Sequence, residues 1–206
     1  MGPEAFYGPL ENVYEVYLLT GVEPLPFKNK IEYHLQNIKN SLELADNYKA
    51  LVDDATSSIA SLLESHNPLH HLAVNNWLYS FDSYDKPGSE AFIHSLVSAH
   101  IAGELAKATI KPDGIPSFTS EDIDSIRAGM LLHDIGKTQC PEFVNSGAVD
   151  FGGVKLDAFK AEHIKYTIEF ANKNHIEEDP IMYQVMVHHH QQPDGEGHPK
   201  FKTNPA

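Results

Sequence analysis

The stretch Leu132-His133-Asp134-Ile135-Gly136-Lys137 is the most informative part of the sequence. It follows an apolar pattern typical of a helix, and its His-Asp dipeptide places an imidazole beside a carboxylate. Together these groups offer one nitrogen and one or two oxygen ligands to a divalent metal. Gly136 allows a tight helix end, and Lys137 lies one turn after His133, where it could face a bound phosphate. Isolated His-Asp pairs are common without a metal, so the interpretation depends on partners elsewhere in the chain.

Further histidines fall inside predicted helices and could join the His-Asp pair. His94 lies mid-helix with Glu90 four residues earlier, a spacing that puts both on one helix face. A surface Glu-His pair that binds no metal would have the same spacing. His163 lies inside another predicted helix, and His188-His189-His190 ends a third. The sequence thus offers candidate ligands on separate helices.

Composition narrows the class of protein. The chain has 206 residues and a formal net charge of −14, which argues against a nucleic-acid polymer as partner. A small phosphate ester stays open as substrate, because bound divalent cations reverse the local field. Cys140 is the single cysteine, which excludes an intrachain disulfide and a cysteine-based zinc site. No apolar run approaches the roughly 20 residues of a membrane span, and no signal peptide is visible, so we expect a cytoplasmic protein.

Helical periodicity dominates and predicts an all-α fold. Apolar residues recur at three- and four-residue steps from Lys28 to Ser65, and Asn67-Pro68 ends that pattern. The later helices are predicted from Ser89 as N-cap through Glu90 to Ala108, from Thr119 or Ser120 to near Gly136, from Asp157 as cap to Asn172, and from Asp179-Pro180 to His190. The tail after His190 shows no periodicity.

A turn-rich segment from Asp82 to Gly88 suggests a boundary between two regions. We predict a helical N-terminal region over residues 1–80, regulatory or dimerising, and a catalytic domain over residues 81–206. The apolar positions from Ile31 to Leu62 could bury against the catalytic domain or against a second chain, as in a homodimer. Periodicity alone leaves both choices open.

The remaining histidines receive structural interpretations. His70 and His71 follow Pro68 and are predicted to lie in a loop rather than to bind metal. His100 follows His94 by six residues and is expected on a different part of the helix. His188 could contact the neighbouring metal ligands without binding the metal itself. Three others are expected on helix surfaces or at helix ends, namely His34, His66 and His175.

The order of these residues resembles the HD superfamily, with a helix histidine, a His-Asp pair and two further helix histidines. The segment His189-His190-Gln191-Gln192-Pro193-Asp194-Gly195-Glu196-Gly197-His198-Pro199 resembles the HD-GYP signature, HHExxDGxGYP. The sequence Leu-His-Asp-Ile-Gly-Lys is also typical of that subfamily. The resemblance covers roughly Glu90 to Pro199. It implies a helical bundle of the HD-domain type that hydrolyses a 3′–5′ phosphodiester in a cyclic dinucleotide such as cyclic di-GMP.

Carried over position by position, the resemblance also implies a ligand set. Asp134 would bridge two metals, Glu90 matches the extra carboxylate of members with a third metal, and Lys137 would contact the scissile phosphate. His198 would lie at the substrate. Two or three divalent ions are implied, and iron or manganese suits nitrogen and carboxylate ligands better than magnesium does. The implied metal ligands are His94, His133, Asp134, His163, His189 and His190, with Glu90 for the third metal.

The sequence also departs from the family pattern. Gln191 stands where the signature has glutamate, and His198 stands where it has tyrosine. Family members carry a further aspartate on a helix after the signature, and no acidic residue follows Glu196 here. These differences bear on metal affinity and turnover.

Four functions therefore stay open. The favoured one is an active cyclic-dinucleotide phosphodiesterase. A degenerate module that binds metal or nucleotide and signals through a partner gains support from Gln191 and His198. An HD-type di-iron oxygenase shares the histidine scaffold, but the segment from Asp194 to Pro199 argues for the signalling subfamily. A mononuclear HD nucleotidase is disfavoured by the paired His189-His190.

Overall fold

The helix before the His-Asp pair begins with a capping box. In this computed structural model, the Thr119 hydroxyl accepts a hydrogen bond from the Asp122 N–H, and the Asp122 carboxylate accepts one from the Thr119 N–H. These bonds satisfy backbone donors at the helix start. The helix, α6, spans Ser120–Leu132, which confirms its predicted start. Its predicted end near Gly136 is wrong, because the backbone tightens after α6 into a turn and the 3-10 helix η2 (Ile135–Gln139).

The structure describes residues 46–84, 90–140, 154–192 and 197–199. Regular structure in these ranges is helical except for two short paired strands, which confirms the all-α fold class. Among the helices in these ranges, none combines the length and apolar character that crossing a membrane requires. The elements besides α6 and η2 are α3 (Asp46–Ala60), η1 (Ser61–Glu64), α4 (Pro68–Tyr84), α5 (Glu90–Ala108), α8 (Val154–Lys173), η3 (Ile176–Glu178), α9 (Pro180–His188), β1 (His190–Gln191) and β2 (Gly197–His198).

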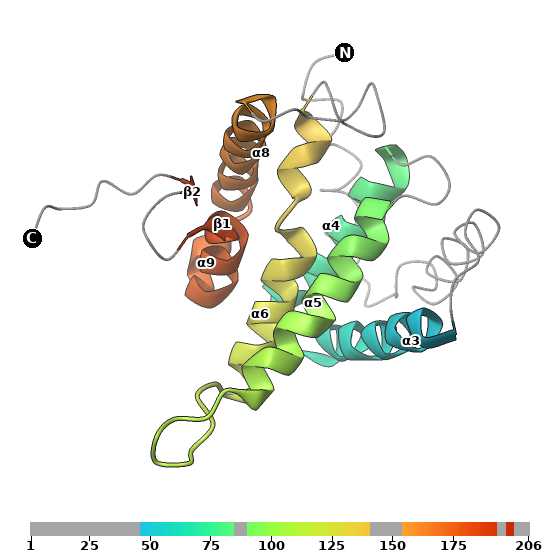
Figure 1. The fold of residues 1–206 in the computed structure, drawn as a ribbon, viewed down its shortest axis with the longest axis vertical. Coiled ribbons are helices and arrows are strands. Elements are labelled where there is room, and N and C mark those ends of the chain that lie inside the picture. The colour runs from blue at the N-terminus through green and yellow to red at the C-terminus, as the bar shows by residue number, and fades with distance from the viewer. Residues whose placement is uncertain (1–45, 85–89, 141–153, 193–196, 200–206) are drawn as a thin grey trace, which may run out of the picture.

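Helix α6 is the element around which the others pack. It lies between α5 on one side and α9 on the other, and it also contacts α4 (Figure 1). Leu131 and Leu132 at its end are fully buried, as is Met186 of α9. Trp77 of α4 stacks on Phe92 of α5 with ring centroids 4.1 Å apart. Because each such buried side chain contributes about 1.5–3 kcal/mol, this core fixes the end of α6, where the His-Asp pair lies.

The described part of the predicted N-terminal region shares this core. Val52 and Ile59 of α3 are fully buried in one cluster with Leu96 of α5, and α3 packs against α5. Helix α3 therefore buries apolar side chains against the predicted catalytic domain, which is one of the two possibilities that the sequence left open. The predicted boundary between residues 1–80 and 81–206 stays a prediction. Residues 1–45, with His34, and the predicted N-cap Ser89 lie outside the described residues.

His70 lies in a buried polar network, so its predicted loop position is wrong. Proline suits the first helical turn, and α4 begins at Pro68, which puts His70 and His71 inside the helix. His70 is fully buried. Its Nε2 atom lies 3.1 Å from Ser125 Oγ of α6 and 3.4 Å from an Asp179 carboxylate oxygen at the start of α9. The network therefore joins α4, α6 and α9 away from the His-Asp pair.

Asp179 is the N-cap of α9, which confirms the predicted start of that helix. Its Oδ1 atom accepts a hydrogen bond from the Met182 N–H at 3.0 Å. Its Oδ2 atom accepts bonds from Ser125 at 2.7 Å and from Asn67 at 3.0 Å. Burial raises the pKa of Asp179, but hydrogen bonds from His70, the Met182 N–H and Ser125 outweigh burial and lower the pKa to about 2.

Two further differences from the sequence-based expectations concern helix and strand positions. Helix α8 begins at Val154, so Asp157 lies within it and is not its cap. An acidic residue is favoured near a helix start as well as at the cap, and the sequence pattern does not separate these two positions. Helix α9 ends at His188 and does not reach the predicted His190, which lies in β1 opposite His198 of β2. Proline, aspartate and glycine are residue types that favour turns, so the sequence at 193–195 is the signal that predicts such a strand pair.

Replacing Asp179 with asparagine should destabilise the fold in a pH-dependent way. The pKa of Asp179 falls from 3.8 to about 2 in the folded chain, so its charge contributes about 2 kcal/mol above pH 4. That contribution is lost as the pH falls from about 4 towards 2. We therefore expect Asp179→Asn to lower the free energy of unfolding by about 2 kcal/mol at pH 7, in urea titrations followed by circular dichroism.

The difference between wild type and Asp179→Asn should shrink when the titrations are repeated at falling pH. Asp54→Asn, at an exposed position on α3, is the matched control and should change stability little at any pH. A difference that stays constant down to pH 2 would contradict the role given to the Asp179 charge.

Candidate metal centre

Five histidines and one aspartate from four parts of the fold converge at the end of α6. Helices α5 and α9 pack directly on α6, and α8 packs on η2, so the core brings these elements to the same place. His94 comes from α5, His133 and Asp134 from the turn after α6, His163 from α8, and His189 and His190 from the junction between α9 and β1.

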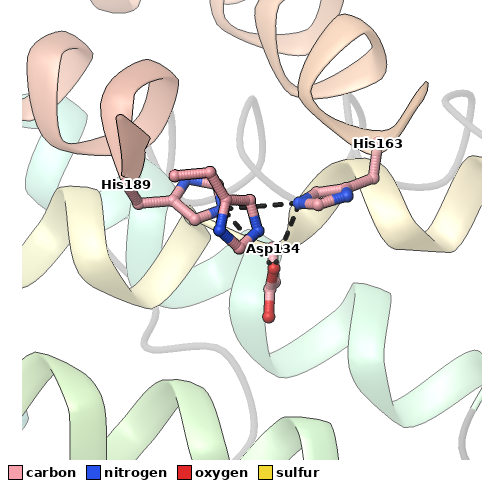
Figure 2. Close-up of side chains that lie close together, drawn as sticks. Asp134, His163 and His189 are labelled. Atoms are coloured by element: carbon pink, nitrogen blue, oxygen red, sulfur yellow. Dashed lines mark hydrogen bonds and ion pairs between the residues drawn. The ribbon is translucent and has the colours of Figure 1, made fainter. Parts of the chain in front are cut away.

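The Asp134 carboxylate lies at the centre of the cluster and its side chain is 2 % exposed. Its Oδ2 atom is 3.2 Å from His133 Nε2 and 3.7 Å from His94 Nε2. Its Oδ1 atom is 3.6 Å from His163 Nε2 and 3.7 Å from His189 Nε2. Figure 2 shows the His163 and His189 rings directed at this carboxylate from α8 and α9. Each oxygen thus faces two imidazole nitrogens.

Backbone carbonyls fix which ring nitrogen carries the proton on two of these histidines. His133 Nδ1 lies 2.7 Å from the Met130 carbonyl oxygen, and His189 Nδ1 lies 2.8 Å from the Met186 carbonyl oxygen. A carbonyl oxygen only accepts, so each Nδ1 donates. In the neutral ring the Nε2 atom then presents its lone pair to Asp134. This is the arrangement by which proteins prepare histidines as metal ligands.

The cluster fits a divalent cation. Asp134 Oδ1 is buried and, within the described ranges, accepts no hydrogen bond. The nitrogens of His163 and His189 that face it lie beyond hydrogen-bond distance. Two ligands that each lie about 2.1 Å from one metal are about 3 to 4 Å apart. The spacing of these atoms therefore suits a shared metal better than direct hydrogen bonds.

The donors fall into two groups that share Asp134. One group consists of His94, His133 and Asp134, and the other of Asp134, His163, His189 and His190, with the ligand atoms of each group within 4.8 Å of one another. The first group opens to solvent, because the His94 side chain is 55 % exposed. The second group is more enclosed, with His163 and His189 side chains at 1 % and 5 %. Access to solvent is what a metal needs to accept a substrate.

Three members of the cluster have pKa values shifted towards the protonation states that a metal requires. Burial raises the pKa of Asp134, but His133 and Lys137 outweigh burial and hold that pKa well below its usual range. Burial, followed by the charge of His133, lowers the pKa of His189 to about 3. The same causes lower the pKa of His94. At neutral pH the carboxylate is therefore ionised and these imidazoles are neutral, the forms that coordinate metal.

The other predicted site residues occupy different positions around the cluster. Lys137 Nζ lies 2.5 Å from Asp134 Oδ2. Glu90 opens α5 one turn before His94, and its side chain lies outside the described part. His198 pairs across the β1–β2 hairpin with His190. His100 faces α3, where its Nδ1 lies 2.8 Å from Ser58 Oγ, so its predicted place on another part of α5 is confirmed.

Sequence reasoning missed Thr167, which supports the cluster from α8. Its hydroxyl accepts a hydrogen bond from the Gly136 N–H at 3.2 Å and donates one to the His133 carbonyl at 3.3 Å. The available signal was its position four residues after His163, which puts both on one helix face.

Alanine substitutions should separate the two donor groups. Asp134→Ala removes the shared ligand, so we expect it to abolish metal binding in both groups. His94→Ala and His163→Ala each disturb one group, so we expect metal content to fall from about two equivalents per chain to about one. Elemental analysis by mass spectrometry, on protein purified without a histidine tag or chelator, measures this stoichiometry.

His66→Ala is the control for this series, because His66 is exposed and lies outside both donor groups. Its metal content should equal that of the wild type. Two equivalents retained in Asp134→Ala would contradict the shared role of this carboxylate.

Comparison with known families agrees with this geometry. No curated protein matches the chain, and no solved structure matches it. The family model of the HD domain matches residues 91–205, which is more than half of the chain and includes all six clustered residues. The chain belongs to the HD domain family.

Proposed function

We propose that this protein is a metal-dependent phosphodiesterase that hydrolyses a cyclic dinucleotide such as cyclic di-GMP. HD domains are commonly metal-dependent phosphohydrolases. The observation that carries the proposal is the sharing of Asp134 by two donor groups. Asp134 would be a ligand to both cations, and a pair of neighbouring cations suits the displacement of a phosphate ester oxygen.

The choice of a cyclic dinucleotide rests on the segment after α9. The sequence from His189 to Pro199 resembles the HD-GYP signature and differs from it at Gln191 and His198. The β1–β2 pairing puts His198 opposite His190, a member of the second donor group. We propose that His198 contacts the bound dinucleotide from this position.

Iron or manganese is the metal that we propose for this donor set. Neutral imidazoles with one carboxylate suit iron or manganese better than magnesium, which prefers oxygen ligands. The two donor groups account for two ions. Glu90, one turn before His94 on α5, is the proposed carboxylate for a third.

The chain's own residues would bind and orient the substrate around this centre. When bound, the divalent ions supply Lewis acidity to the phosphodiester and lower the pKa of the attacking water. Asp134 holds its negative charge at neutral pH because its pKa lies well below the usual range. The Lys137 side chain is 22 % exposed and its ammonium reaches the cluster at Asp134 Oδ2. We assign it the contact with the scissile phosphate, where it would stabilise the negative charge of the transition state.

The net charge of the chain bears on the size of the substrate. The net charge of −14 disfavours a nucleic-acid polymer, which needs an extended basic surface. A dinucleotide can instead be held by local positive charge at a metal centre. A cytoplasmic location and a homodimer through the N-terminal helices stay predictions.

Lys137→Ala should impair hydrolysis without emptying the metal centre. We expect kcat for cyclic di-GMP, with Mn²⁺ present, to fall about 10²- to 10³-fold, because one donor to the transition state is lost. Lys137 is outside the two donor groups, so metal content should stay close to that of the wild type. Chromatographic detection of the linear dinucleotide measures the rate.

The matched control is Lys165→Ala, at an exposed position on α8 whose partner is Glu169. Its kcat should equal that of the wild type. If the metal-loaded wild type hydrolyses no cyclic dinucleotide yet binds one, the degenerate signalling module is the correct function. Oxygen consumption by the iron-loaded protein would instead indicate the di-iron oxygenase.

A further inference from the structure

One face of α8 carries both a proposed ligand and a hydroxyl directed at the His-Asp turn. His163 and Thr167 are four residues apart, so they project from the same side of the helix. Both are fully buried. This face packs against η2, the 3-10 helix that continues the chain directly after Asp134. Thr167 therefore lies between the α8 ligand and the turn that supplies the shared carboxylate.

The Thr167 hydroxyl bonds to the backbone on both sides of Asp134. It accepts from the Gly136 N–H at 3.2 Å and donates to the His133 carbonyl at 3.3 Å. A hydroxyl has one donor and two acceptor positions, so both bonds form at once. Because its partners precede and follow Asp134 in the chain, the hydroxyl holds the short backbone segment from which the Asp134 side chain projects.

The same contact requires glycine at position 136. A Cβ atom there would lie 2.0 Å from the His163 carbonyl oxygen and 2.7 Å from the Thr167 backbone nitrogen and from its hydroxyl oxygen. The backbone of the turn thus touches the backbone of α8 without an intervening side chain. This close approach accompanies the 3.6 Å separation between His163 Nε2 and Asp134 Oδ1.

We propose that Thr167 is a positioning residue that sets the distance between Asp134 and His163 for metal binding. This inference rests on the proposed metal centre. Both of these hydrogen bonds of the hydroxyl go to backbone groups, so we infer that it acts through the backbone that carries Asp134. Residues that orient ligands in this way change metal affinity about 10- to 100-fold when they are replaced.

Thr167→Val tests the inference, because valine keeps the shape of threonine and removes its hydroxyl. We expect the dissociation constant for Mn²⁺, measured by isothermal titration calorimetry on the full chain, to rise about 10- to 100-fold. Thr167→Ser keeps the hydroxyl and should bind Mn²⁺ within about threefold of the wild type. If Thr167→Val fails to fold, Thr167→Ala takes its place with the same expected direction.

Thr138→Val separates positioning from a general loss of stability. Thr138 is also buried in η2, but its hydroxyl donates to the Ile135 carbonyl within the same turn and does not link the turn to α8. We expect it to lower the melting temperature without changing the Mn²⁺ dissociation constant. Equal weakening in Thr138→Val and Thr167→Val, or unchanged affinity in Thr167→Val, would overturn the positioning role alone. Absence of Mn²⁺ binding in the wild type would overturn the proposed function, and the inference with it.

Discussion

The burial of the Asp134 carboxylate is the constraint on which this structure depends. An ionised carboxylate removed from water costs several kcal/mol unless positive charge or hydrogen-bond donors surround it. Here Oδ2 has Lys137 and His133 beside it, whereas Oδ1 accepts no hydrogen bond within the described part of the chain. The packing of α5 and α9 on α6, and of α8 on η2, brings histidine nitrogens to this carboxylate from separate elements. The helical core and the candidate metal centre are therefore built by the same contacts.

A second buried carboxylate, Asp179, has its charge stabilised by hydrogen bonds from the protein alone. Asp179 accepts hydrogen bonds from Asn67, Ser125 and the Met182 N–H, so both of its oxygens are satisfied by the chain itself. These hydrogen bonds join α4, α6 and α9, and they satisfy the carboxylate without a metal ion. Asp134 lies among histidines in a comparable degree of burial but keeps one oxygen without a donor. Because burying an unsatisfied oxygen is costly, that difference supports a ligand role for Asp134 and a structural role for Asp179.

The sequence motifs and the family resemblance named residues that the fold brings together, and the role of these residues as metal ligands stays a prediction. The His-Asp pair and the His189-His190 pair come together in the fold as the sequence suggested. The supporting residues were harder to predict, since their roles arise between segments distant in the chain. Nothing local indicates that His70 meets Asp179, or that the Thr167 hydroxyl reaches the backbone around residue 134. Helix ends were less predictable for the same reason, because tertiary contact with α8 shapes the turn at Gly136.

The two residues that differ from the resembled HD-GYP signature lie in the β1–β2 ladder. Gln191 pairs with Gly197 and His198 pairs with His190 in the β1–β2 ladder. Such pairing uses backbone N–H and carbonyl groups, which every non-proline residue supplies. The register that positions His190 can therefore persist when the side chains at 191 and 198 change. Neither substitution falls in the group formed by His94, His133 and Asp134. Both differences therefore lie on the β1–β2 side of the cluster, and not among the donors of that first group.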